Sequence, residues 1–94
     1  MDTSLFDWDQ ANISHVAAHN VHPEEAEEVM LGDSLEMDFE KSAGEDRWIY
    51  IGETLHGRIL QIVVTMRGEK IRVVTAFEPI RRFKFLYLRS KAGL

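Results

Sequence analysis

Two histidines lie one helical turn apart near the start of the chain. Asn12, His15 and His19 stand at i, i+3 and i+7, so they are expected to share one polar face of a helix. Imidazole is the side chain best suited to proton transfer near neutral pH, which makes both histidines candidates for general acid–base catalysis. The alternative is a structural role, in which a ring N–H bonds a backbone carbonyl or a neighbouring acid.

A metal site on this helix is a second interpretation of the same pair. His-x-x-x-His can hold zinc, but Val16 stands where the His-Glu-x-x-His motif has its glutamate. A third ligand would have to come from His22 or from a carboxylate. We therefore predict no metal and no other cofactor.

The second half of the chain carries most of its arginine and lysine. Arginine binds two oxygens of a phosphate at once through its planar fork. Arg67 and Arg72 flank a predicted hairpin, and a basic segment from Arg81 to Lys91 follows Pro79. If these segments pack together, their cations would line one basic groove. The alternative is an ordinary solvated helix face.

Charge is divided unevenly between the two halves of the chain. Residues 1–46 hold thirteen acids and one lysine, for a net charge of −12, while residues 47–94 hold three acids and ten lysines or arginines, for +7. The net charge of the whole chain is −5. Such a division is typical of proteins that bind a polyanion or an oppositely charged protein, or of halves that neutralise each other within one fold.

The length and composition indicate one cytoplasmic domain. Ninety-four residues suffice for a single domain, 1–94, with a core of modest size. The absence of cysteine excludes disulfides, thiol nucleophiles and cysteine-based zinc sites. No apolar run reaches membrane-spanning length, and the acidic N-terminus lacks the features of a signal peptide. We therefore expect a cytoplasmic protein with no membrane partner.

The hydrophobic periodicity predicts an α+β fold. We expect two N-terminal helices, a four-stranded antiparallel meander sheet and a basic C-terminal helix, with the helices covering one face of the sheet. A short strand or extended arm precedes them at 4–8. The predicted helices span 10–19, 23–31 and 80–91, and the predicted strands span 35–40, 47–52, 58–67 and 70–77, with a loop at 41–46.

Capping residues and apolar stripes locate these elements. Asp9 suits the N-cap of the first helix, and Asn20 suits a positive-φ position after it. Pro23 opens the second helix. Three apolar sets are expected to be buried: Ile13, Val16 and Ala17; Leu35, Met37 and Phe39; and Ile80, Phe83 and Tyr87.

The BrnT family of small bacterial toxins, whose fold belongs with the RelE-like ribonuclease toxins, is similar to this chain over nearly its whole length. The blocks that carry the resemblance are, in order, WDQANISHVAAHNV, PEEAEEV, RWIYIGET, GRILQIVVTMRGEKIRVVTA and RRFKFLYL. The resemblance implies a ribonuclease that arrests growth and a neighbouring gene for a ribbon-helix-helix antitoxin, BrnA. The antitoxin would hold the toxin in a two-plus-two complex and make the DNA contacts that repress the shared promoter.

The resemblance also implies a mechanism and a set of site residues. RNA cleavage without a metal uses the neighbouring 2′-OH as the nucleophile, so the protein must orient it, stabilise the phosphate and move two protons. Tyr87 would stack a base or donate a proton. The catalytic candidates are His15, His19, Arg67, Arg72, Arg82 and Tyr87, and the RNA-binding candidates are Arg58, Arg81, Lys84 and Arg89.

The chain departs from the pattern of the family at four positions. Glu53 and Phe77 each replace an arginine, Phe83 replaces a glutamate, and Asn20 replaces a glycine. Together these changes indicate an impaired or repurposed nuclease. Phe77, Phe83 and Phe85 favour an alternative function, a non-catalytic BrnT-like relative that has kept the antitoxin-binding surface and acts as a protein-interaction or regulatory module, since extra aromatics are typical of protein interfaces. A third possibility is an unrelated small interaction domain that shares only the fold.

Overall fold

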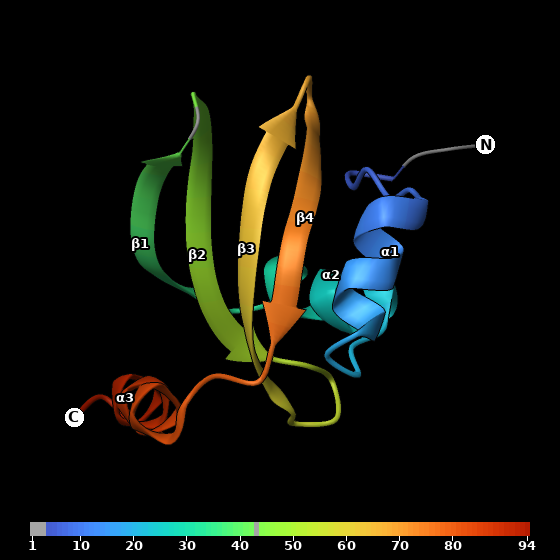
Figure 1. The fold of residues 1–94 in the computed structure, drawn as a ribbon. Coiled ribbons are helices and arrows are strands. Elements are labelled where there is room, and N and C mark those ends of the chain that lie inside the picture. The colour runs from blue at the N-terminus through green and yellow to red at the C-terminus, as the bar shows by residue number, and fades with distance from the viewer. Residues whose placement is uncertain (1–3, 43) are drawn as a thin grey trace.

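The chain folds into three helices and one antiparallel sheet, which confirms the predicted α+β class (Figure 1). The computed structural model describes residues 4–42 and 44–94. The helices are α1 (Gln10–Ala17), α2 (Pro23–Leu31) and α3 (Arg81–Lys91), and the strands are β1 (Leu35–Ser42), β2 (Glu45–Glu53), β3 (Ile59–Arg67) and β4 (Lys70–Phe77). None of the helices in these ranges is long and apolar enough to cross a membrane.

The sheet is a simple meander with the strand order β1-β2-β3-β4. Gly68, at a φ of +63°, and Glu69 form the tight turn between β3 and β4, as predicted. The predicted loop at 41–46 is wrong, because β1 and β2 continue through most of it and Lys41 pairs with Asp46. An ion pair of 3.7 Å between these two side chains supports the extended hairpin.

A bulge in β1 changes which of its side chains share a face. Leu35 pairs with Ile51, and Phe39 pairs with Trp48, but the register shifts between these pairs, after Glu36. Ile51 and Trp48 are three residues apart on β2, so Leu35 and Phe39 lie on opposite faces of the sheet. The prediction that they form one buried stripe is therefore wrong, and both side chains remain more than two-fifths exposed.

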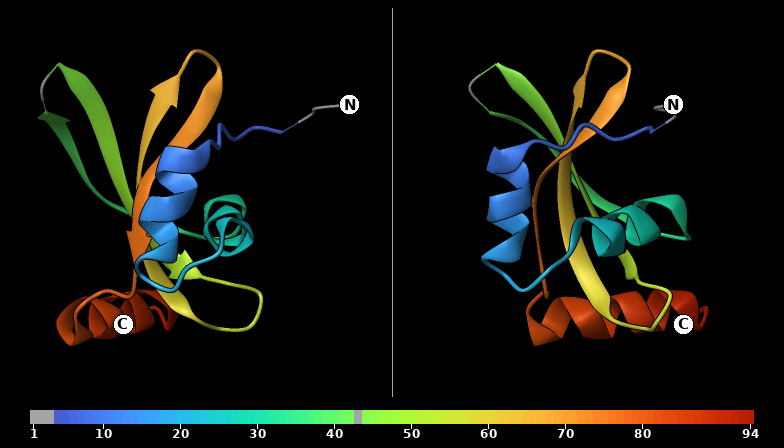
Figure 2. Two further views of the ribbon diagram at one scale, coloured as in Figure 1. Left: turned by 45° about the vertical axis from the view of Figure 1, so that its right-hand side comes forward. Right: turned by 90° about the vertical axis from the view of Figure 1, so that its right-hand side faces the viewer.

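The helices lie on different sides of the sheet (Figure 2). Helix α2 packs on the face formed by β2 and β3, whereas α1 runs along the edge strand β4 and borders the opposite face. Only α2 therefore covers a face of the sheet in the way the sequence predicted.

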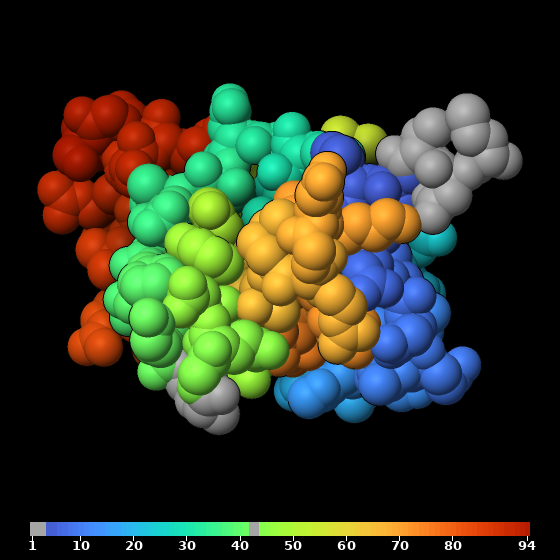
Figure 3. Space-filling model, turned by 90° about the horizontal axis from the view of Figure 1, so that it is seen from above, coloured from blue at the N-terminus to red at the C-terminus, as the bar shows by residue number. Residues whose placement is uncertain are grey.

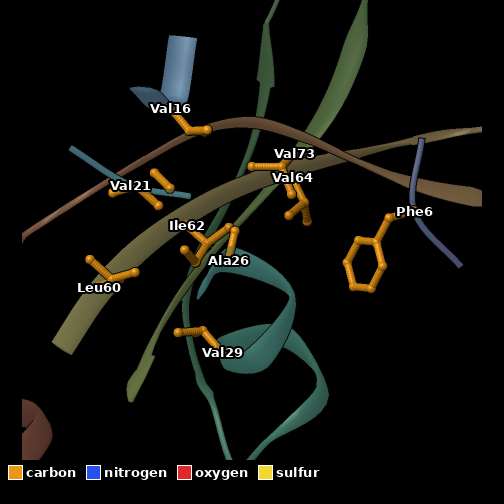
Figure 4. Close-up of a cluster of buried hydrophobic side chains, with 10 residues drawn as sticks. Phe6, Val16, Val21, Ala26, Val29, Leu60, Ile62, Val64 and Val73 are labelled. Carbon is orange, nitrogen blue, oxygen red and sulfur yellow. The ribbon is translucent and has the colours of Figure 1, made fainter. Parts of the chain in front are cut away.

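The hydrophobic core lies between α2 and the sheet. It includes Phe6, Val16, Val21, Ala26, Val29, Leu60, Ile62, Val64, Val73 and Ala76 (Figure 4).

Helix α1 buries a different stripe from the predicted one. Val16 is fully buried, but Ile13 and Ala17 are exposed and Asn12 is buried instead. An edge strand has backbone groups without a strand partner. A polar side chain on α1 can therefore bond the backbone of β4, and Asn12 does so. The helix ends at Ala17, two residues before the predicted end, and Asn20 adopts the expected positive φ of 60°.

Helix α3 crosses the end of the sheet that lies opposite the β3–β4 turn (Figures 1 and 2). Of the three apolar residues expected to face the sheet, Tyr87 is buried and Phe83 is partly buried. The prediction is wrong for Ile80, which caps the helix and is 58% exposed. The reason is that α3 meets the end of the sheet rather than its face, so only a narrow strip of the helix is covered.

Candidate active-site cleft

A cleft of about 200 Å³ opens between α1 and the sheet face that α2 leaves uncovered. Seen from the β3–β4 turn, the two hairpin tips and α1 lie side by side around this region (Figure 3). The residues that line the cleft are Ala11, Asn12, His15, Glu45, Arg47, Thr65, Arg72 and Val74. An imidazole, a carboxylate and two guanidinium groups thus share one small space.

Asn12 fixes α1, and with it His15, against the sheet. Its side-chain amide donates to the carbonyl of Val73 on β4 at 3.1 Å and to the carbonyl of Asp7 at 2.9 Å. Its oxygen accepts from the N–H of Asp9 at 2.7 Å. Asn12 is 3% exposed and its side-chain bonds are satisfied, so it sets the position of the helix relative to β4.

Asp9 connects the start of α1 to Arg72 on β4. Its carboxylate caps the helix by accepting from the N–H groups of Ala11 and Asn12, which confirms the predicted N-cap. The same carboxylate accepts two hydrogen bonds from Arg72, at 3.1 and 3.2 Å. The hydrogen bond from Arg72 and those from the helix start hold the pKa of Asp9 below its ordinary value.

A second acid and a second arginine complete this cluster at the rim of the cleft. Asp7 lies 3.5 Å from Arg67 and 3.9 Å from Arg72, and Arg67 also lies 3.8 Å from Asp9. The side chain of Arg72 is only 13% exposed, whereas that of Arg67 is 58% exposed. Both candidate arginines are therefore held by acids from the segment before α1.

Glu45 and Arg47 form the opposite wall of the cleft. Nε of Arg47 donates to the carboxylate of Glu45 at 2.9 Å, and the hydroxyl of Thr65 donates to the carbonyl of Asp46 at 2.7 Å. Neither Glu45 nor Arg47 was predicted as a site residue: Glu45 falls in the predicted loop at 41–46, and Arg47 starts the predicted strand at 47–52. Their spacing of two residues, which places both on one face of a strand, is the signal that could have identified them.

The two histidines occupy different surroundings. Their ring centroids are 6.5 Å apart and nearly parallel, so they share a helix face as predicted. His15 lines the cleft, whereas His19 lies one turn further along, with its ring 5.8 Å from that of Phe77. The site in the cleft therefore contains one of the two.

Arg58 lies apart from the cleft in a network of its own. Its guanidinium donates to Glu25 at 2.9 Å, to Glu78 at 3.1 Å and to the carbonyl of Asn20 at 2.7 Å. Lys84 adds an ion pair to Glu78 at 3.5 Å. These contacts tie the turn between α1 and α2 to the segment before α3, which gives Arg58 a bracing position.

Tyr87 is enclosed where α3 meets the sheet. It is 2% exposed, and its hydroxyl donates to Glu53 at 3.1 Å. Burial, together with the carboxylate of Glu53, raises the pKa of Tyr87 to about 12. The Tyr87 hydroxyl therefore keeps its proton, and neither face of the ring is free to stack on an RNA base.

The remaining basic candidates lie on α3, away from the cleft. Arg67 and Arg72 belong to the hairpin whose turn lies at one end of the sheet, and α3 crosses the other end (Figure 1). The candidates thus fall into three groups rather than one continuous groove: the cleft, the Arg58 network, and α3 with Arg81, Arg82 and Arg89. Within residues 4–42 and 44–94, no three His, Cys, Asp or Glu side chains gather in a way that could hold a metal ion.

Comparison with known proteins identifies the family. A profile described as "Ribonuclease toxin, BrnT, of type II toxin-antitoxin system" matches residues 8–80, which include the cleft and stop just before α3. No curated protein matches the chain. Since the match covers well over half of the 94 residues, the chain belongs to the BrnT family of ribonuclease toxins of type II toxin–antitoxin systems.

Proposed function

We propose that this protein cleaves RNA in the cleft between α1 and the open sheet face. The observation that carries the proposal is that His15, Glu45, Arg47 and Arg72 line the same cleft. Together they supply the groups that RNA cleavage by the 2′-OH requires, namely two proton-transfer groups and cations for the phosphate.

The reaction is an in-line displacement at phosphorus. Glu45, held by Arg47, accepts the proton of the 2′-OH while the O2′–P bond forms, and His15 gives a proton to the O5′ leaving group as the P–O5′ bond breaks. Arg47 and Arg72 stabilise the charge on the crowded phosphate. The products are a 2′,3′-cyclic phosphate and a 5′-hydroxyl, and the chemistry requires no metal.

Residues outside the cleft take supporting parts in this proposal. Arg67, half-exposed at the rim, guides the RNA backbone toward Arg72. His19 extends the polar face of α1 beyond His15. Arg81, Arg82, Lys84 and Arg89 raise the local concentration of RNA through their charge. Tyr87 and Arg58 hold elements in place rather than touch the substrate.

The toxin acts in the cytoplasm and is held in check by a ribbon-helix-helix antitoxin. Contact with DNA occurs only through that antitoxin.

The carboxylates of Asp7 and Asp9 compete with RNA for Arg72. In the free protein both acids form ion pairs with its guanidinium, so a phosphate of the RNA must displace a carboxylate to reach it. This competition lowers the affinity for RNA, and the contacts between arginine and phosphate make that affinity fall as the salt concentration rises.

A non-catalytic relative is the second candidate function, and one set of contacts favours it. Glu53, where the family carries arginine, is bonded to Tyr87 rather than open to solvent, and Phe77 lies against His19. Positions that would otherwise offer positive charge at this end of the sheet therefore hold an acid and an aromatic ring. Such a protein would keep the surface that binds the antitoxin but would have no ribonuclease activity.

Induction of the chain in a bacterial host, together with cleavage of labelled RNA by the purified protein in EDTA, separates the two functions. The nuclease proposal predicts growth arrest and products that end in a 2′,3′-cyclic phosphate. Arg72→Ala removes a cleft residue and should reduce cleavage strongly, whereas Arg82→Ala on α3 should change it little. A folded protein that neither arrests growth nor cuts RNA would establish the non-catalytic relative.

A further inference from the structure

The outward side of α3 combines exposed apolar side chains with positive charge. Phe85 is 59% exposed and lies at the centre of this side, with Arg81 and Arg89 four residues away on either side and Leu88 three residues away. We call the surface made by Arg81, Arg82, Phe85, Leu88 and Arg89 the α3 outer face. Seen from the β3–β4 turn, α3 forms a separate flank of the molecule (Figure 3).

The charge of the α3 outer face is not neutralised by any carboxylate in residues 4–42 and 44–94. Within the part that the structure describes, no carboxylate lies within ion-pair distance of Arg81, Arg82 or Arg89. The guanidinium carbon of Arg82 lies 5.6 Å from the centroid of the Phe83 ring. An aromatic ring does not neutralise the charge, so Arg82 can still pair with an acid. In contrast to the paired arginines of the cleft and of the Arg58 network, these three cations are therefore open to pair with acids of another molecule.

The opposite side of α3 anchors it to the sheet through Tyr87 and its bond to Glu53. No other helix or strand among the described residues packs broadly on α3. The helix is therefore fixed from one side while its outer face remains uncovered. An exposed aromatic side chain, Phe85, beside a half-exposed leucine, Leu88, and flanked by arginines is typical of a protein interface.

We propose that the α3 outer face docks an acidic amphipathic segment of the antitoxin. Phe85 and Leu88 would pack on its apolar side, and Arg81, Arg82 and Arg89 would pair with its acids. The inference rests on the proposed toxin function only in that it requires an antitoxin. Recognition by paired charges and by an apolar contact together would favour an antitoxin segment that carries both over one that carries only acids.

Two other occupants fit the α3 outer face less well. RNA would use the arginines and the ring of Phe85, but it has no aliphatic surface to bury Leu88, which is half-exposed. A second copy of the chain could offer the acids of β1. However, the bulge places Leu35 and Phe39 on opposite faces of that strand, so β1 presents no apolar stripe to meet Phe85.

The test is calorimetric titration of the full chain with the purified protein encoded by the adjacent short reading frame. Phe85→Ser combined with Leu88→Ser should weaken binding by at least about 30-fold, the effect expected from removing an interface anchor. Arg81→Glu combined with Arg89→Glu should weaken it similarly. Leu55→Ser, at an exposed apolar position on the β2–β3 loop, is the matched control and should bind as the wild type does. Thermal unfolding would verify that each variant folds.

Four results would overturn the docking proposal. The first is an unchanged affinity of the Phe85/Leu88 variant for the adjacent gene product. The second is no binding of that gene product to the wild type. The third is unchanged antitoxin binding with a loss of single-stranded RNA binding in fluorescence anisotropy, which would assign the face to RNA. The fourth is wild-type self-association that the variant abolishes in sedimentation, which would assign the face to a second copy of the chain. Failure of the nuclease proposal is a separate result: the wild type would not cleave RNA, whereas the titration with the antitoxin would be unaffected.

Discussion

Arg72 binds Asp9 through both terminal nitrogens of its guanidinium, at 3.1 and 3.2 Å, while Asp9 caps α1 with the same carboxylate. One acid thus joins the start of a helix to an edge strand 63 residues away in sequence. The pair also fills the arginine fork that the proposed mechanism needs for a phosphate. This relationship leads to predictions on both RNA affinity and stability.

Asp9→Asn should increase affinity for RNA. Asparagine is a good N-cap, so the start of α1 is retained, but the carboxylate that competes with phosphate for Arg72 is removed. We expect a several-fold lower Kd for a labelled RNA in fluorescence anisotropy at low salt. Glu24→Gln, an exposed change of the same charge on α2, is the control. If both variants gain equally, the effect is one of net charge and the Arg72 explanation fails.

The difference in stability between the wild type and Asp9→Asn should become smaller as the pH falls. Because the folded-state pKa of Asp9 is lowered, the ionised carboxylate stabilises the fold above the ordinary Asp pKa, and this contribution disappears as the pH falls through the lowered folded pKa. Urea unfolding should therefore show the wild type as the more stable protein at pH 7. The difference should narrow below about pH 4. A difference independent of pH would contradict the ion-pair assignment.

Asn12→Ala should destabilise the protein and loosen α1. The change removes the donors to Val73 and Asp7 and leaves two carbonyls without those bonds, which costs on the order of 2 kcal/mol in the free energy of unfolding. Gln10→Ala, which removes an exposed amide from the same helix, should cost much less. Chemical denaturation compares them, and equal effects would show that Asn12 does not hold α1 against β4.

Tyr87→Phe should reduce stability but leave RNA cleavage almost unchanged. The variant loses the hydroxyl that bonds Glu53, a contribution of about 1 kcal/mol. In the wild type the pKa of Tyr87 is raised to about 12, so the stability contributed by the neutral phenol is complete below the ordinary tyrosine pKa. It should be lost as the pH rises from about 10 toward 12. A large fall in the cleavage rate at neutral pH would instead make Tyr87 a catalytic residue.

Local sequence signals predicted the strands and helix starts well, because those signals act over a few residues. The bounds of β4 are the predicted 70–77, since the Gly68 turn and the alternation of Ile71 and Val73 fix them. Pro23 likewise begins α2 as expected. The bulge in β1 was not predictable, because it depends on how β1 meets β2, and it moved Phe39 to the other face.

The candidate site was harder to predict because its contacts join distant parts of the chain. His15 and Arg72 were predicted from residue type. Glu45 and Arg47 were not, because they reach the cleft only through the extension of the β1–β2 hairpin into the predicted loop at 41–46 and through its packing beside α1. Arg58 was predicted to bind RNA, but its guanidinium already donates to three acceptors, in Glu25, Glu78 and the carbonyl of Asn20. Residue type indicated which side chains can do chemistry, whereas three-dimensional packing determined which of them meet.

The most direct test of the proposed nuclease is the single-turnover rate of RNA cleavage by the wild type, His15→Ala and His56→Ala. His15 lines the cleft, whereas His56 lies on the exposed β2–β3 loop, so the pair is matched in chemistry and differs in position. Loss of a proton-transfer group should lower the rate by roughly 10²–10⁴-fold in His15→Ala and leave His56→Ala unaffected. Equal rates for wild type and His15→Ala would contradict cleavage in this cleft.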